Sequence, residues 1–238
     1  MIRLITSYYL DSNSDRQSEI DECLSNNVNN EYLDEILLFC KSIPNTKNKK
    51  IKIIKSNRPT FNDFLTHVND ITGEEDINIL SNTDIFFDKS LNKLKQFPIK
   101  GKVLCLLRWE RNKEGASKIK TIRADCQDSW IFKGKIKTGD MWLDFHMGKL
   151  GCDNRICYEF KNAGYKLENP CFLIRSHHLH NTNKRNYKET LVGQEGHSDN
   201  KDVIPPPYEW VQPVNTAWYR NILRFFKGLR VVLFKRSR

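Results

Sequence analysis

Short apolar runs alternate with polar, helix-favouring stretches through much of this chain, and that alternation restricts its fold more than any other feature. Strands that alternate with helices favour a mostly parallel sheet, because each parallel connection needs a crossover. We therefore expect an α/β fold. The runs expected to be strands are Ile2 to Thr6, Glu35 to Cys40, Ile51 to Lys55, Ile77 to Leu80, Ile85 to Phe87, Val103 to Leu107, Ser129 to Phe132 and Cys171 to Ile174.

Helices are expected between these strands. The polar loop from Asp11 to Asp15 can cap the first helix, Pro59 and Thr60 suit the start of the second, and Gly164 would end the third. The three helices are expected through Glu22 to Leu24, over Phe61 to Val68 and over Arg155 to Ala163.

The length of 238 residues and the apolar content of 39% suit one core of ordinary size with a short appendage. We expect a folded domain over residues 1–200, followed over residues 201–238 by a proline-containing connector and a basic segment. The stretch from Trp218 to Arg238 mixes aromatic and basic residues and has no acidic one. A helix of this composition either lies on an anionic membrane surface or docks on the domain, and the sequence leaves both open.

A formal charge of +10 suits a partner that carries phosphate, such as a nucleotide, a nucleic acid or an anionic membrane. The seven cysteines lack the paired C-x-x-C spacing of a zinc knuckle or a redox site, so we expect them to be reduced. No apolar stretch approaches the roughly 20 residues that span a bilayer. We therefore expect a cytoplasmic protein, in peripheral contact with a membrane if the basic segment binds one.

Polar residues follow several of the expected strands directly, and in open α/β sheets ligands bind beyond the carboxyl ends of the strands. These residues are Thr6 to Tyr8, Asn82 to Asp84, Arg108 to Glu110 and His177 to His180.

Asp84 is the candidate ligand of a divalent cation, with Asn82 two residues before it. Asn82 and Asp84 are also common formers of ordinary turns. His178 and His180 share one face if the chain stays extended, which suits a metal ligand and a phosphate donor. The alternative is one buried, hydrogen-bonded histidine among exposed ones. The sequence thus predicts a metal site with Asp84, His178 and His180 as ligands.

Taken in order, four stretches of this chain match a known pattern: the chain resembles the small GT-A glycosyltransferases of bacteria and large DNA viruses. The likeness covers about residues 1–190. The four stretches are Ser81 to Asp88, Gln127 to Phe132, Gly151 to Arg155, and His178 to His180 with Arg185 to Tyr187.

The resemblance implies a GT-A-like, Rossmann-like fold, with a mixed, mostly parallel sheet flanked by helices and here a basic C-terminal helical tail. It also implies a nucleotide-sugar donor, with a UDP-sugar favoured, a glycan or lipid-linked acceptor, and Mn²⁺ or Mg²⁺ as cofactor. Asp84 and a C-terminal histidine would bind the metal. Asn82 stands where the family's turn usually has an acidic residue. Thr6, Tyr8 and Arg58 would lie near the base and ribose, and Lys184 and Arg185 would clamp the diphosphate.

An inverting transfer needs a base for the acceptor hydroxyl, and Asp153 is the first candidate. Its place at a helix N-terminus argues partly against this role, because the helix dipole lowers a carboxyl pKa and an N-cap is a common use of Asp. Asp128 is the second candidate. Trp109 or Trp130 could stack on a sugar face, although burial in the core is the common fate of such rings.

Two other classes of protein compete with this interpretation. A basic nucleic-acid-binding protein without catalytic activity would use the same charge, but no recognised module supports it, and we expect no nucleic-acid partner. A zinc hydrolase could use the histidines; the chain lacks the H-E-x-x-H spacing, and Asp84 would have to be the third ligand.

Overall fold

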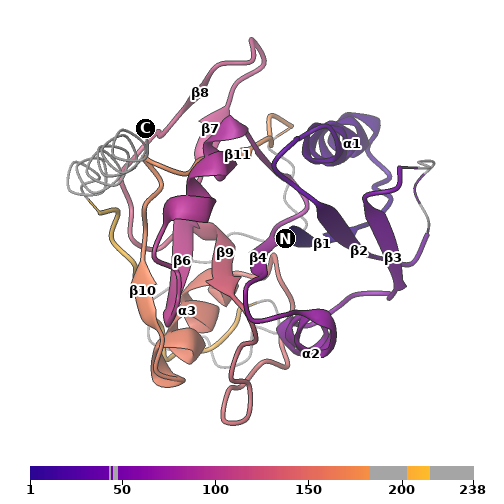
Figure 1. The fold of residues 1–238 in the computed structure, drawn as a ribbon. Coiled ribbons are helices and arrows are strands. Elements are labelled where there is room, and N and C mark those ends of the chain that lie inside the picture. The colour runs from indigo at the N-terminus through magenta and orange to yellow at the C-terminus, as the bar shows by residue number, and fades with distance from the viewer. Residues whose placement is uncertain (43, 45–47, 183–202, 215–238) are drawn as a thin grey trace, which may run out of the picture.

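The computed structural model describes residues 1–42, 44, 48–182 and 203–214. A seven-stranded sheet forms its centre (Figure 1). The strands of this sheet are β1 (Ile2–Tyr8), β2 (Glu35–Cys40), β3 (Ile51–Lys55), β4 (Ile77–Ser81), β6 (Lys102–Leu107), β9 (Gln127–Lys133) and β10 (Lys166–Glu168). Their order is β10-β6-β9-β4-β1-β2-β3, and β9 runs antiparallel to both its neighbours whereas the other neighbours pair in parallel.

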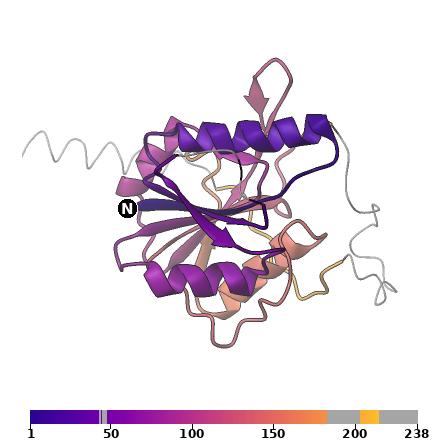
Figure 2. The same cartoon turned by 90° about the vertical axis from the view of Figure 1, so that its right-hand side faces the viewer.

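A smaller, four-stranded sheet packs beside the first, and helices cover the large sheet on both faces. Figure 2 shows α1 on one face and α2 and α3 on the other. The helices are α1 (Ser14–Val28), α2 (Phe61–Ile71), α3 (Cys152–Asn162) and the 3₁₀ helix η1 (Lys89–Gln96). The small sheet has the order β5-β11-β7-β8, with β5 (Ile85–Phe87), β11 (Ser176–His178), β7 (Trp109–Arg111) and β8 (Ser117–Lys118). The expected mixed, mostly parallel sheet flanked by helices is confirmed.

The inner strands of the large sheet are buried on both faces because both faces are covered. Successive residues point to opposite sides, so Ile5 packs with Phe64 of α2 and Phe160 of α3, whereas Leu4 packs with Leu91 of η1 in a second cluster. The continuous apolar runs in the sequence reflect these two clusters.

Local capping fixes where the helices begin. The side chain of Asn13 accepts a hydrogen bond from the backbone N of Arg16 at 2.9 Å, which places Arg16 in the first turn of α1. Thr60 and Asp63 form a capping box on α2. Gly151 precedes α3 at φ 81°, and a Cβ there would lie 3.0 Å from the hydroxyl of Tyr208.

The expected strand from Cys171 to Ile174 is wrong. The backbone N atoms of Leu173 and Ile174 both donate to the carbonyl of Pro170, so the segment is a turn whose apolar side chains still reach the core. The strand β11 starts only at Ser176, and therefore contains two of the histidines that were expected to follow it.

Residues 203–214 pack against the domain. The backbone N of Val211 donates to the carbonyl of Ala124 at 2.8 Å, and Ile204 and Val211 belong to the core. The boundary near residue 200 stays a prediction, and the basic segment from Trp218 lies outside the described residues. Within the described part of the chain, no helix has the length and apolar character that crossing a membrane requires.

Candidate active site

The loops after β1, β4 and β6 meet at one edge of the large sheet, because these strands run in the same direction. The antiparallel strand β9 begins at the same edge. The hydroxyls of Ser7 and Thr83 lie 2.9 Å apart, joining the first two loops. Asp128 of β9 accepts from the Asn82 side chain at 2.6 Å and from Arg108 at 2.9 Å. The polar strand ends predicted from the sequence therefore do come together.

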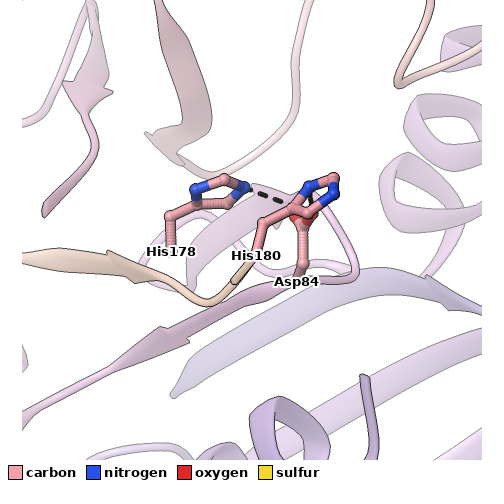
Figure 3. Close-up of side chains that lie close together, drawn as sticks. All are labelled: Asp84, His178 and His180. Atoms are coloured by element: carbon pink, nitrogen blue, oxygen red, sulfur yellow. Dashed lines mark ion pairs between the residues drawn. The ribbon is translucent and has the colours of Figure 1, made fainter. Parts of the chain in front are cut away.

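Asp84 lies with His178 and His180 in one cluster, shown in Figure 3. Its Oδ2 atom is 3.3 Å from Nε2 of His178 and 3.8 Å from Nδ1 of His180. Strand pairing produces this arrangement, since His178 pairs with Ile85 and the backbone N of Leu179 donates to the carbonyl of Asp84. The candidate ligand atoms all lie within 4.8 Å of one another, and a carboxylate with two imidazoles is a donor set that suits a divalent transition metal.

Glu110 orients His178, a role that the sequence did not suggest. Its Oε2 accepts a hydrogen bond from Nδ1 of His178 at 2.8 Å, so that Nε2 faces Asp84. Burial alone would lower the pKa of His178, but the Asp84 carboxylate and Glu110 raise it to about 9. Burial would raise the pKa of Glu110, whereas His178 and Arg108 hold it at about 2.

Arg16 is a second residue that the sequence did not suggest. Its Nη2 lies 2.6 Å from Oδ2 of Asp84, and both side chains are largely buried. Burial of the Asp84 carboxyl would raise its pKa, but His178 and Arg16 hold it far below its usual range. The guanidinium thus supplies part of the positive charge that a metal would supply, and a metal would share Asp84 with it.

Asp128 and Asp153 are neighbouring carboxyls, and Asp128 is linked to this cluster through Arg108 and Glu110. Burial and the negative charge of Asp128 raise the pKa of Asp153 to about 7, which outweighs the backbone N–H groups at the start of α3. The lowering expected from the helix N-terminus is therefore not the net effect. Both oxygens of Asp128 already accept hydrogen bonds, from Asn82 and Arg108. A carboxyl whose pKa is near neutrality suits a general base, which favours Asp153 over Asp128.

A continuous line of ion pairs connects Asp128 with the cluster of Asp84, His178 and His180. Glu110 bonds both His178 and Arg108, and Arg108 also bonds Asp128. Because the carboxylates and the cationic groups alternate along this line, each charge is neutralised by its neighbours although all are partly or wholly buried.

The structure does not bring Tyr8 to the cluster. Its hydroxyl donates to Asp21 of α1 at 2.8 Å, and its ring packs with Ile20 under that helix. The following residue, Tyr9, lies near Arg16 and Asp84 instead. Successive residues of an extended chain point in opposite directions, so the side chain of Tyr9 lies on the side of the cluster and that of Tyr8 lies on the other side.

Trp130 has no free face, and Trp109 has one face covered. Trp130 is completely buried in the core against Phe61, because β9 is covered on that face. Trp109 lies on the opposite face of β7 from Glu110; its indole N–H donates to the carbonyl of Cys171, and the Arg175 guanidinium lies 4.6 Å above its ring. The prediction that one of them stacks on a sugar is therefore wrong for Trp130, and Arg175 already covers one face of Trp109.

The remaining predicted residues either lie around the same edge of the sheet or fall outside the residues that the structure describes. Thr6 is buried within β1, next to Ser7, whose hydroxyl contacts Thr83. Arg58 is exposed on the loop between β3 and α2. Lys184 and Arg185 lie outside the described residues and stay predictions.

Replacing Glu110 by glutamine is expected to lower the pKa of His178 from about 9 towards the ordinary histidine value. The neutral amide still accepts a hydrogen bond but no longer attracts the imidazolium. Titration of the histidine ring protons by NMR in metal-free protein measures this pKa. Glu22→Gln on the exposed side of α1 is the matched control and should leave it unchanged; an unaltered pKa in Glu110→Gln would contradict the contact.

Comparison with known proteins gives structural likeness only. No family model matches the chain, and no curated protein matches it significantly. Among solved structures, S. aureus TarS (residues 1–349) in complex with UDP-GlcNAc has a TM-score of 0.48 at 12% identity, covering 74% of this chain and 57% of that one. The Pyrobaculum calidifontis mannosyltransferase PcManGT in complex with GDP-Man and Mn²⁺ has a TM-score of 0.46 at 13% identity, covering 75% and 56%.

A third structure, 4-diphosphocytidyl-2C-methyl-D-erythritol synthase from Anaerococcus prevotii, has a TM-score of 0.42 at 12% identity and covers 77% of this chain and 91% of that one. The chain thus spans a little over half the length of the TarS and PcManGT structures. At these TM-scores the likeness carries no weight for function, and the inferences below rest on the chain's own residues.

Proposed function

We propose that this chain is a nucleotide-sugar-dependent glycosyltransferase, which moves a sugar from a nucleotide-diphosphate donor to a hydroxyl group of a glycan or lipid-linked acceptor. The observation that carries the proposal is the meeting of Asp84, His178 and His180 at the carboxyl edge of a mostly parallel sheet. This edge is where open α/β sheets bind their ligands. The resemblance seen in the sequence points to the same activity.

The three side chains would hold a divalent cation, which neutralises the charge that develops on a departing diphosphate. Mg²⁺ prefers oxygen ligands, whereas imidazole suits transition metals. Of the two expected metals, we therefore favour Mn²⁺. Arg16, already on Asp84, would add a second positive charge to the same site.

Asp153 is the proposed base that takes the proton from the acceptor hydroxyl in an inverting transfer. Its raised pKa lets it accept a proton near neutral pH, and the negative charge of Asp128 increases its affinity for that proton. Hydrogen bonds from Asn82 and Arg108 hold Asp128 in place, so that its charge stays next to Asp153.

The donor, favoured as a UDP-sugar, would contact the loops after β1 and β4. Ser7, Thr83 and Asn82 offer polar groups there, and Thr6 and Arg58 remain proposed contacts of the base and ribose. Lys184 and Arg185 remain proposed contacts of the diphosphate. The proposed location is the cytoplasm, with membrane contact through the segment from Trp218 to Arg238 if it forms an interfacial helix.

A zinc hydrolase is the second candidate, because the ligand set now includes the third residue that this class requires. Two imidazoles and a carboxylate are also a common zinc set, with a fourth position left for water. The two functions differ in what they bind: a hydrolase would take up Zn²⁺ without any need for a nucleotide.

Thermal unfolding with a panel of UDP-, GDP-, dTDP- and CMP-sugars, each with and without Mn²⁺, tests the proposal. Ligands that bind only the native state stabilise it by about 2.7 kcal/mol at a hundred times Kd. We expect one nucleotide class to raise Tm in a Mn²⁺-dependent way. Stabilisation by Zn²⁺ alone would favour the hydrolase, and salt-sensitive retention on DNA or RNA without any nucleotide effect would favour the nucleic-acid-binding alternative.

A further inference from the structure

The N-terminal part of α1 contacts both segments that carry the candidate metal ligands. Arg16 and Glu19 are three residues apart on one face of the helix, and Nη1 of Arg16 lies 3.0 Å from Oε2 of Glu19. While Nη2 of Arg16 reaches Asp84, its Nη1 also donates to the carbonyl of Leu179 at 3.2 Å. Leu179 stands between the two histidines.

Glu19 contacts the chain directly after His180. Its Oε1 accepts from the backbone N of Asn181 at 2.6 Å and of Thr182 at 3.0 Å, and its Oε2 accepts from the Thr182 hydroxyl at 3.2 Å. The carboxylate is buried, and both its oxygens are engaged. One side chain of α1 therefore holds two consecutive backbone amides.

These contacts matter because His180 lies outside any strand. The strand β11 ends at His178, and beyond it the backbone N of Leu179 donates to the carbonyl of Asp84. On the other side of His180, Glu19 holds the backbone amides of Asn181 and Thr182. His180 thus lies between two fixed points, one at Asp84 and one at Glu19.

We propose that Glu19 is a positioning residue, which places His180 for metal binding by anchoring the chain that follows it. This inference rests on the metal site of the proposed function. A ligand on a loop loses conformational entropy when it binds a metal, and an anchor removes part of that loss in advance. Without Glu19, the backbone amides of Asn181 and Thr182 would lose their acceptor. The Arg16 guanidinium would lose one of its acceptors and keep Asp84 and the carbonyl of Leu179.

Titration calorimetry with Mn²⁺ alone tests the role of Glu19 in metal binding. Loss of an outer-shell partner typically weakens metal affinity by about 10–100-fold, and we expect this loss for Glu19→Ala. Glu19→Gln keeps one acceptor oxygen for the amides and should recover part of the affinity. Glu22→Ala is the matched control, because the Glu22 carboxylate lies one turn further along α1 and is exposed. The affinity of this variant for Mn²⁺ should equal that of the wild type.

Amide hydrogen exchange at residues 181 and 182 tests the anchor separately from the metal. Both amides should be protected in the wild type and in Glu22→Ala, and should exchange faster in Glu19→Ala or, if that variant does not fold, in Glu19→Gln. A wild type that binds no Mn²⁺ would refute the metal site of the proposed function, and the anchoring would then be decided by exchange alone. Unchanged exchange, or unchanged Mn²⁺ affinity in a folded Glu19→Ala protein, would overturn the inference.

Discussion

Replacing Asp84 by asparagine is expected to abolish Mn²⁺-dependent binding of the donor and to lower kcat/KM by about 10³-fold, which corresponds to about 4 kcal/mol. Asp84 is the only carboxylate of the three-residue ligand set, and the two imidazoles carry no negative charge. The substitution keeps the size of the side chain, so the loss would report the charge. Calorimetric titration with Mn²⁺ and turnover of the donor class found by thermal unfolding measure the two effects.

The same substitution should also destabilise the fold. Arg16 and His178 would lose the carboxylate that neutralises them in a largely buried place, a change that typically costs about 3–5 kcal/mol. Asp88→Asn is the matched control: Asp88 follows β5, four residues after Asp84, and pairs with His177, which does not belong to the cluster. Metal-dependent donor binding that survives in Asp84→Asn but not in Asp88→Asn would place the metal elsewhere.

The main features of the fold were predictable because both faces of the large sheet are covered. A strand buried on both sides reads as a continuous apolar run, and β2 and β6 are of this kind. The segment from Cys171 to Ile174 has the same composition but is a turn, since apolar side chains on a turn can fill the same core. Composition alone does not distinguish the two.

The meeting of the three candidate metal ligands was predictable because these residues follow or lie in strands that end at one edge. Arg16 and Glu110 were not, for different reasons. Arg16 lies in the first turn of a helix, where a basic residue gives no sequence signal for a distant carboxylate. Glu110 lies on a three-residue strand, and which of two neighbours faces the cluster is set by its pairing with β11.

Replacing Asp153 by asparagine is expected to lower kcat by about 10²–10⁴-fold while leaving Mn²⁺ and donor binding intact. Asparagine cannot take the acceptor proton, but it can still accept hydrogen bonds at the start of α3 and so preserve the helix. Steady-state kinetics with varied donor separates the two effects, and donor-induced stabilisation of the variant checks that its binding site is intact. A kcat close to that of the wild type would assign the base to another group.

The pH dependence gives the same test without removing the base. A base must be unprotonated to act, so kcat/KM should rise as pH increases through about 7, the raised pKa of Asp153. Asp128→Asn removes the nearby negative charge that favours the protonated form, and therefore should move this rise to lower pH. The control substitution Asp125→Asn removes a carboxylate that pairs with Arg123 on the surface, and it should leave the dependence of kcat/KM on pH unchanged. If the rise lies near pH 4 in the wild type, or does not move in Asp128→Asn, the two carboxyls do not share a site and Asp153 is not the base.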